Sequence, residues 1–269
     1  LALWCGHFQV RYGLAGITLE ILDWSQSYLQ GNLVRLGSVE WELRESYAAA
    51  WSLLRGAERR WVIAPGTWLS YGGRHRCAGG EPGARRAGGS IDDERVVAHP
   101  IDTSRGAVDL DTVITLDRAE WTCELSPAST LLEMHIPEDA RLELAAFVQS
   151  ARRAERLFAR FDARKPEGAF GDAWLLDPQI RALLPRSAGI AVLQAAVALV
   201  PGAIPEEKTL RRLFGPTATR ASVLASSRVS MTSLQRAVAA FLEDRGNMLS
   251  AACGVLPGDA LDALERATR

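Results

Sequence analysis

The sequence predicts an α+β fold, in which helices pack around one curved sheet of mixed α/β type. Three observations lead to this prediction. The chain has 269 residues, of which 48% are hydrophobic and 23% are charged, and this is enough apolar material for a sizeable core. Strand patterns joined by short turns dominate the middle of the chain. Helices and strands alternate in the second half, so the helices are expected to cover a central sheet.

The first third of the chain is expected to begin with a helix and to continue as strands. Residues 1–30 carry apolar side chains at roughly helical spacing, interrupted by glycine. A strand is predicted where Val39, Trp41 and Leu43 alternate with polar residues, which is the pattern of a half-buried strand. Residues 48–60 fit either a helix or part of a meandering sheet.

Residues 72–90 interrupt these patterns. The segment is dense in glycine and arginine and has almost no large apolar side chain. Such a stretch cannot bury enough surface to offset the entropy lost on ordering, so we predict a flexible surface loop. A phosphate-binding loop would need a strand before it, a helix after it and a defined glycine spacing, and the sequence shows none of these.

The second half alternates between strands and helices. Residues 144–161 form the clearest helix, because apolar side chains from Leu144 to Phe161 fall on one face and arginines on the other. Thr232 and Gln235 have the spacing of a capping box and mark the start of another helix. The predicted strands are 111–116, 131–136, 169–176, 189–200 and 251–256, and the other predicted helices are 179–184 and 206–214.

Charge and composition argue against several classes of protein. The formal net charge is −1, which gives no electrostatic reason to expect a nucleic-acid or membrane partner. No apolar run approaches the roughly 18 residues of a membrane-spanning helix. Because there is no signal-peptide pattern and too few cysteines for a disulfide framework, we expect a cytoplasmic protein. The Cys–His pairs at 5–7 and 75–77 lack the spacing of a structural zinc site, and no metal is predicted.

Four stretches, in this order, resemble a known family. The bacterial acyltransferase-domain proteins combine a helical N-acyltransferase N-terminal domain with a GNAT-like C-terminal domain. The resemblance implies that residues 1–34 are a remnant of the helical domain, 35–258 the GNAT-like acyltransferase domain and 259–269 a C-terminal tail. The stretches that carry it are Arg35-Leu-Gly37 with Glu40-Trp-Glu-Leu43, Leu131-Leu-Glu-Met-His-Ile-Pro137, Trp174-Leu-Leu-Asp-Pro178 and Thr232-Ser-Leu-Gln-Arg-Ala-Val238.

The resemblance implies an N-acyltransferase. Such a protein takes an acyl group from acetyl-CoA or another acyl-CoA and passes it to an amine of a small molecule or peptide. In the fold, a central strand precedes a long helix whose N-terminus holds the pyrophosphate, since free backbone N–H groups favour an anion there. Here the strand would be 131–136, the helix would begin near Arg141, and the strand at 169–176 would part from the central one to admit the pantetheine arm.

The catalytic residues implied by the resemblance are His135, Glu133 and Asp177. Glu133 and His135 share one face of the central strand, and either could accept the proton of the amine. The alternatives are a histidine bonded to neighbouring backbone and an exposed strand carboxylate. Asp177 could orient a substrate ammonium, although Asp before Pro at a helix start is an ordinary cap, and we favour the cap.

The acyl-CoA contacts implied by the resemblance come from the same elements. Met134 and Ile136 lie on the other face of the central strand. Arg141 opens the long helix and could bind phosphate, and Trp174 could line an acyl pocket, although a core position suits a tryptophan better.

Three departures from the family leave a second interpretation open. Residues 138–141 read Glu-Asp-Ala-Arg where the family usually has glycine, and 171–173 read Gly-Asp-Ala where it usually has Cys-His-Ser. Leu193, Ala195 and Ala196 replace its basic and aromatic residues. The alternative is therefore a catalytically inactive GNAT-like module that binds a ligand or a partner.

Overall fold

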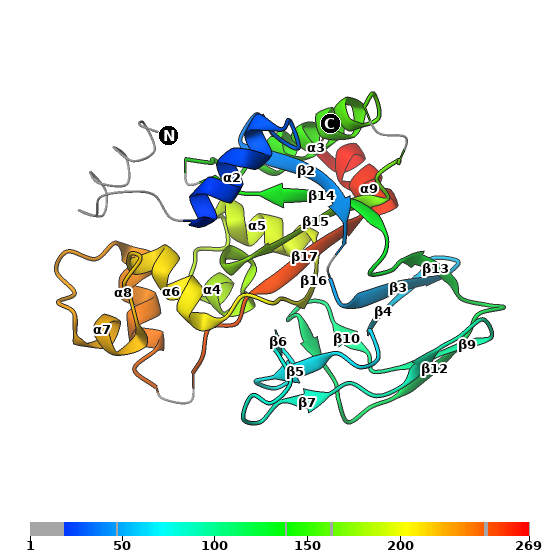
Figure 1. Cartoon of the computed structure of the whole chain (residues 1–269), viewed down its shortest axis with the longest axis horizontal. Helices are drawn as coiled ribbons and strands as arrows, with labels where there is room; N and C mark the ends of the chain where they lie inside the picture. The colour runs from blue at the N-terminus through cyan, green and yellow to red at the C-terminus, as the bar shows by residue number, and fades with distance from the viewer. Residues whose placement is uncertain (1–18, 47, 138, 162–163, 245–246, 269) are drawn as a thin grey trace.

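A six-stranded mixed sheet forms the centre of the molecule (Figure 1). The computed structural model describes residues 19–46, 48–137, 139–161, 164–244 and 247–268. In the central sheet β14 and β15 are parallel, and every other neighbouring pair is antiparallel. Its strands, in spatial order, are Leu33–Leu36 (β1), Val39–Glu45 (β2), Thr130–His135 (β14), Gly168–Ala173 (β15), Ala252–Pro257 (β17) and Ala198–Pro201 (β16).

Three helices cover one face of this sheet. They are Leu144–Phe158 (α3), Gly189–Ala196 (α5) and Gly258–Thr268 (α9). The apolar side of α3 packs on β2 and β14, and this layer is the main core. Trp41 is fully buried there, and its indole Nε1 donates a 2.7 Å hydrogen bond to Ser150 Oγ on α3.

Small antiparallel sheets cover the other face. They come from the segment between β2 and β14, and their apolar side chains pack against Leu131, Phe170 and Val200 of the central sheet. Their strands are Ala50–Arg55 (β3), Glu58–Ile63 (β4), Trp68–Ser70 (β5), His75–Arg76 (β6), Arg85–Arg86 (β7), Ser90–Ile91 (β8), Arg95–Ala98 (β9), Ile101–Asp102 (β10), Ala107–Val108 (β11), Ile114–Asp117 (β12) and Thr122–Leu125 (β13).

Short helices form a separate apolar cluster, with α6, α7 and α8 at the left of Figure 1. The predicted capping box is confirmed, since Thr232 Oγ1 accepts from Gln235 N at 3.2 Å and Gln235 Oε1 accepts from Thr232 N at 2.8 Å. The elements of this part are the 3₁₀ turn Trp174–Leu176 (η1) and the helices Pro178–Ala182 (α4), Glu206–Phe214 (α6), Arg220–Ala225 (α7) and Ser233–Phe241 (α8).

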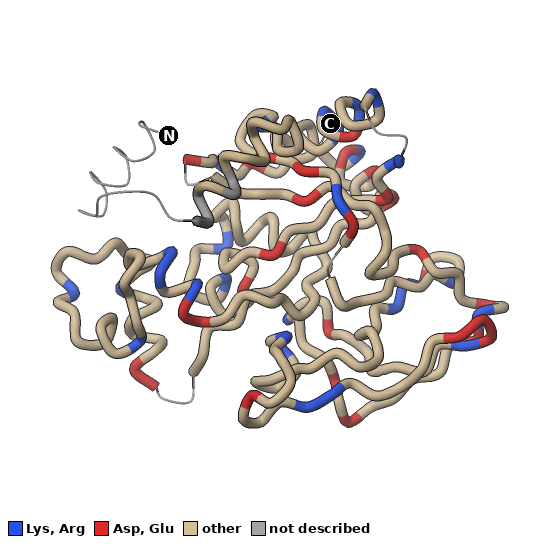
Figure 2. The backbone as a smooth tube through the Cα atoms, viewed as in Figure 1, with Lys and Arg blue, Asp and Glu red and all other residues tan. Residues whose placement is uncertain are grey.

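Of the predicted N-terminal helical remnant, the structure describes the helix Leu19–Leu29 (α2), which precedes β1. Residues 1–18 lie outside the described residues, so the helical domain stays a prediction. Among the helices in the described ranges, none has the length and apolar character needed to span a membrane. Basic and acidic residues are interspersed along the described backbone (Figure 2).

The prediction of a strand at 189–200 was wrong over most of its length. The segment forms α5, and β16 begins only at Ala198. Ile190 and Leu193 are both buried, as an apolar run would be in a strand, so burial does not distinguish the two structures. A short run that is apolar on every side shows no periodicity that separates helix from strand.

Three other boundaries differ from prediction. The alternation around Val39 belongs to a hairpin that turns at Gly37, whose φ of 77° favours glycine. The long helix ends at Phe158, and Phe161, predicted to face inward, is 82% exposed. The predicted tail is helix α9, which buries Leu261 against the main core.

Two predictions about the middle of the chain are resolved by strand pairing. The segment 48–60, which fitted either a helix or a sheet, forms β3 and β4. Residues 72–90 contain β6 and β7, which pair on either side of β5. The expected flexibility of this segment stays a prediction.

Candidate functional site

The parallel strands β14 and β15 separate at their carboxyl ends. They pair over two residues each, and Glu133 opposite Phe170 is the last pair. β14 then continues to His135, whereas β15 continues to Ala173 and stays paired with β17. The pairing of β14 with β15 therefore ends after Glu133, and a cleft wide enough for the pantetheine arm stays a prediction.

Met134 comes directly after the last strand pair, where β14 and β15 are still in close contact. A Cβ atom at Gly171 would lie 2.9 Å from the Met134 carbonyl oxygen and 2.5 Å from its Cγ, so only glycine lets the strands approach here. The Met134 side chain is buried in the main core. Ile136 is half-buried and packs against the same core just beyond the strand.

Glu133 and His135 face the same side of the sheet as Glu42, as predicted for the first two. His135 Nε2 lies 3.9 Å from Oε2 of both Glu42 and Glu133. Arg44 Nη1 lies 3.0 Å from Glu133 Oε2 and 3.9 Å from Glu42 Oε2. The Glu133 side chain is only 7% exposed, which excludes the alternative of an exposed strand carboxylate.

This cluster combines two acids, one imidazole and one guanidinium. The neighbouring imidazole of His135, 3.9 Å away, and the guanidinium of Arg44 hold the pKa of Glu42 below its usual value despite partial burial. The ligand atoms of Glu42, Glu133 and His135 lie within 4.8 Å of one another, a spacing that could also hold a metal ion. Arg44 already provides the positive charge that such an ion would bring.

Glu42 and Arg44 were not predicted as site residues from the sequence. Both lie on the polar side of the alternating strand β2, and β2 pairs with β14 so that Glu42 is opposite Glu133. The alternation was visible in the sequence, but the register that places β2 beside the central strand was not.

The amino ends of α3 and α5 meet beside the separated strands. Neither helix has a side-chain cap or an acidic residue in its first turn. A Cβ atom at Gly189, the first residue of α5, would collide with the Leu142 carbonyl oxygen just before α3. A small hollow lies between the two helix starts, and its lining residues are Leu142, Glu143, Leu144, Phe147, Gly189 and Leu193.

Charged residues of both signs precede α3, which begins at Leu144 and has Glu143 as its N-cap residue. Arg141, the predicted phosphate ligand, is exposed three residues before the helix. Asp139 accepts a 2.8 Å hydrogen bond from Arg35 Nη2, and this pairing lowers the pKa of the Asp139 carboxyl. The Asp139 carboxylate is therefore paired with Arg35, whereas Glu143 makes no cap bond at the helix start.

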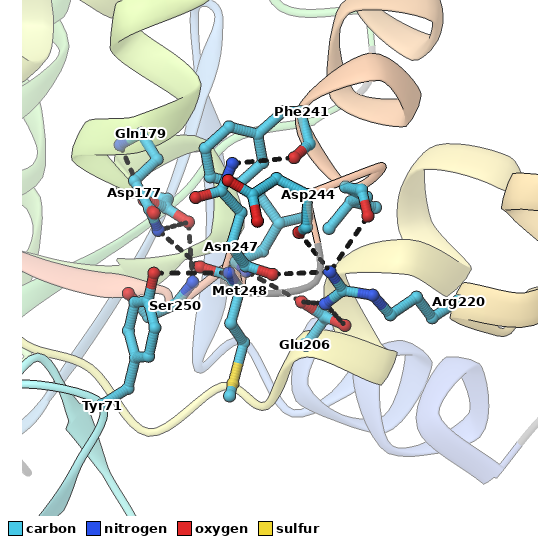
Figure 3. Close-up of polar contacts among 12 residues, drawn as sticks. Tyr71, Asp177, Gln179, Glu206, Arg220, Phe241, Asp244, Asn247, Met248 and Ser250 are labelled. Carbon is cyan, nitrogen blue, oxygen red and sulfur yellow. Dashed lines mark hydrogen bonds and ion pairs between the residues drawn. The ribbon is translucent and has the colours of Figure 1, made fainter.

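Asp177 caps helix α4, as favoured from the sequence (Figure 3). It is fully buried, and it accepts 2.8 Å hydrogen bonds from Gln179 N and from Ser250 N. Burial raises the pKa of Asp177 to about 6, although these bonds oppose the shift. Trp174 packs against the helical cluster rather than the main core.

A polar network holds the segment before β17 (Figure 3). Arg220 donates to the carbonyl oxygens of Leu242, Asp244 and Asn247 and pairs with Glu206 at 3.2 Å. Glu206 also accepts from the backbone N–H of Leu249 at 2.8 Å. With Asp177, this network orders the backbone that leads into the central sheet. The structure thus brings Glu133 and His135 together, buries Met134 on the opposite face of β14, and places Asp177 and Trp174 at the start of α4.

Comparison with known families identifies the domain. The family model described as GNAT-like C-terminal domain matches residues 33–256. The chain belongs to this family. No curated protein sequence matches it.

Solved acyltransferase structures share the fold of this GNAT-like domain. A mutant acyltransferase in complex with octanoyl-CoA matches with 19% identity and a TM-score of 0.53. An acyltransferase in complex with decanoyl-CoA and teicoplanin matches with 20% identity and a TM-score of 0.53. Each match covers 95% of this chain and 55% of the other, so the chain spans about half the length of these acyltransferases.

Proposed function

We propose that this GNAT-like domain transfers an acyl group from acyl-CoA to an amine. The observation that carries the proposal is the separation of β14 from β15 after Glu133, beside His135 and beside two uncapped helix starts. The solved acyltransferases of the same fold hold octanoyl-CoA or decanoyl-CoA, which supports a medium-chain acyl donor.

The donor would lie between the separated strands. The pairing of β14 with β15 ends at Glu133, so a backbone N–H of β14 beyond this residue would polarise the thioester carbonyl and stabilise the developing oxyanion. The first-turn N–H groups of α3 and α5 would bind the pyrophosphate, with added positive charge from Arg141. Met134 and Ile136 would contact the acyl-bearing arm from the core side.

His135 would act as the base. Its imidazole takes a proton from the acceptor amine, and the nitrogen attacks the thioester carbonyl carbon. The carbon–sulfur bond then breaks, its electron pair leaves on the CoA sulfur, and the thiolate is protonated as the amide forms. Glu42 and Glu133, both 3.9 Å from His135 Nε2, would stabilise the imidazolium. The ion pair with Arg44 makes Glu133 the weaker candidate for the base.

The acceptor would be an amine of a small molecule or peptide. One of the similar acyltransferases was solved with teicoplanin, which supports an acceptor of this size. A cytoplasmic location stays a prediction from the cysteine content.

The test separates binding from transfer. Calorimetry with octanoyl-CoA should show saturable binding to the wild type, and thiol release should follow when an amine panel is added. His135→Gln should lower the rate of thiol release by about 10²–10⁴-fold, while octanoyl-CoA affinity stays within about twofold. Glu133→Gln is the matched variant, and it should lose less activity.

Two results would count against this function. Absence of octanoyl-CoA binding contradicts acyl transfer as a whole, and full activity of His135→Gln removes His135 as the base. Binding without thiol release for any amine supports the inactive binding module instead.

A further inference from the structure

Asp172 lies opposite His135 across the separated strands. In the parallel register Glu133 is opposite Phe170, so two residues further along His135 corresponds to Asp172. Side chains two residues apart on a strand share a face, so Glu133, His135 and Asp172 all belong to the same face of the sheet. His135 lies on one side of the opening and Asp172 on the other.

Only one of the two carboxyl oxygens of Asp172 accepts a hydrogen bond within the described part of the chain. Its Oδ2 accepts a 3.0 Å hydrogen bond from Ala203 N, but its Oδ1 is buried and has no hydrogen-bond partner among the described residues. Burial raises the pKa of this carboxyl, and the nearby Glu133 raises it further, although Ala203 N–H, Arg76 and Lys208 oppose the shift. An under-satisfied buried carboxylate destabilises a fold and therefore needs an explanation.

Glycine at position 202 leaves room for Oδ1, since a Cβ atom there would lie 2.6 Å from it. The turn is exposed at the next residue, Ala203, and a ligand would reach the buried Oδ1 only if this turn moved. The segment from β6 borders the same turn, because His75 bridges to Gly202 and Arg76 N donates to the Gly202 carbonyl oxygen at 2.9 Å.

His75 adds unmatched polar atoms at this turn. Both of its ring nitrogens are buried without a hydrogen-bond partner among the described residues. Burial lowers the pKa of His75, which keeps the ring neutral near pH 7. A neutral imidazole does not compete with a cation for Asp172.

We propose that Asp172 binds the ammonium group of the acceptor and so selects primary alkylammonium substrates. The inference deepens the proposed function, on which it rests for the amine being an acyl acceptor. An ammonium at Oδ1 would sit between two carboxylates, Asp172 and Glu133, on the face that carries His135. From there His135 could take its proton and release the free amine for attack on the thioester.

The test uses n-pentylammonium chloride as the probe and 1-pentanol as its uncharged analogue. Calorimetry at pH 7 should show binding of pentylammonium, but not of pentanol, to the wild type. Asp172→Asn should weaken pentylammonium binding about ten- to a hundredfold, as expected for loss of a charged hydrogen-bond partner. Asp93→Asn removes one carboxylate from an exposed position and should leave the affinity unchanged.

Melting temperature distinguishes a binding residue from a structural one. Asp172→Asn should melt above the wild type, because the amide keeps an oxygen for Ala203 N–H and removes a poorly solvated charge. In transfer assays with saturating octanoyl-CoA, the variant should raise KM for pentylamine more than it lowers kcat.

Any of three results overturns the inference: no pentylammonium binding to the wild type, equal binding by Asp172→Asn, or a lower melting temperature for that variant. An equal loss in Asp93→Asn also overturns it, since only net charge would then matter. The binding assay needs no CoA, so amine binding through Asp172 without acyl transfer would contradict the proposed function and leave the ammonium site standing.

Discussion

At the scale of single residues, Asp177 couples stability to pH. Its pKa is about 6 in the folded chain and about 3.9 when unfolded, so between these values the folded state binds more protons. The free energy of unfolding therefore falls as pH rises from 4 to 6. Above pH 6, Asp177 has lowered this free energy by about 3 kcal/mol relative to its value below pH 4.

Asp177→Asn tests this linkage. The variant should lose the bond to Ser250 N, yet its stability relative to the wild type should improve as pH rises from 4 to 7. Urea unfolding at several pH values measures the difference. A constant difference between variant and wild type across this range would show that Asp177 does not titrate there.

The polar residues of the candidate site were only partly predictable. Glu133 and His135 follow from the alternation of one strand together with a recognised motif, and both lie where predicted. Glu42 and Arg44 could not be found in the same way, because their approach depends on which strand pairs with β14 and in which register. The under-satisfied state of Asp172 depends on a turn thirty residues away in the chain and has no local signal.

At the scale of elements, the contact between the starts of α3 and α5 depends on one glycine. Gly189→Ala should force α5 away from Leu142 and destabilise the fold by about 1–3 kcal/mol, as overpacking does. It should also weaken octanoyl-CoA binding, because the two helix starts would no longer converge. Calorimetry and urea unfolding measure both effects.

Gly88→Ala is the matched control. A Cβ atom at Gly88 would meet its nearest neighbour, His99 Nε2, at 3.6 Å, which is an ordinary contact. This variant should change stability by no more than about 0.5 kcal/mol and leave binding intact. If the two variants lost equal stability and binding, the contact with Leu142 would not be the cause of the losses in Gly189→Ala.

Elements with local signals were predicted well, and those defined by tertiary packing were not. The capping box at Thr232 and the amphipathic face of α3 require only neighbouring residues, and both are present. The run 189–200 required knowledge of what surrounds it, because a segment that is apolar throughout carries no periodic signal.

At the scale of the whole molecule, Arg59 joins parts of the chain that are far apart in sequence. It bonds to Glu124 Oε1 at 2.7 Å within the sheet of β13, β3 and β4, and to Asp259 Oδ1 at 2.6 Å at the start of α9. Its side chain is 25% exposed, whereas Arg60, which pairs with Glu58 of the same strand, is 55% exposed.

Arg59→Met should therefore destabilise the fold by about 1–2 kcal/mol and speed hydrogen exchange in α9, since a networked, partly buried pair is worth more than an exposed one. Arg60→Met should cost less than about 0.5 kcal/mol. Similar losses in both variants would show that the link to α9 contributes nothing beyond an ordinary surface ion pair.

The position of β17 has a consequence for biosynthesis. This strand comes late in the chain, yet it lies between β15 and β16, which are both made earlier. While the protein is being translated, β15 and β16 therefore each present an open edge until residues 252–257 leave the ribosome. Open edges recruit other strands, so premature termination before this point should yield aggregates rather than a smaller working domain.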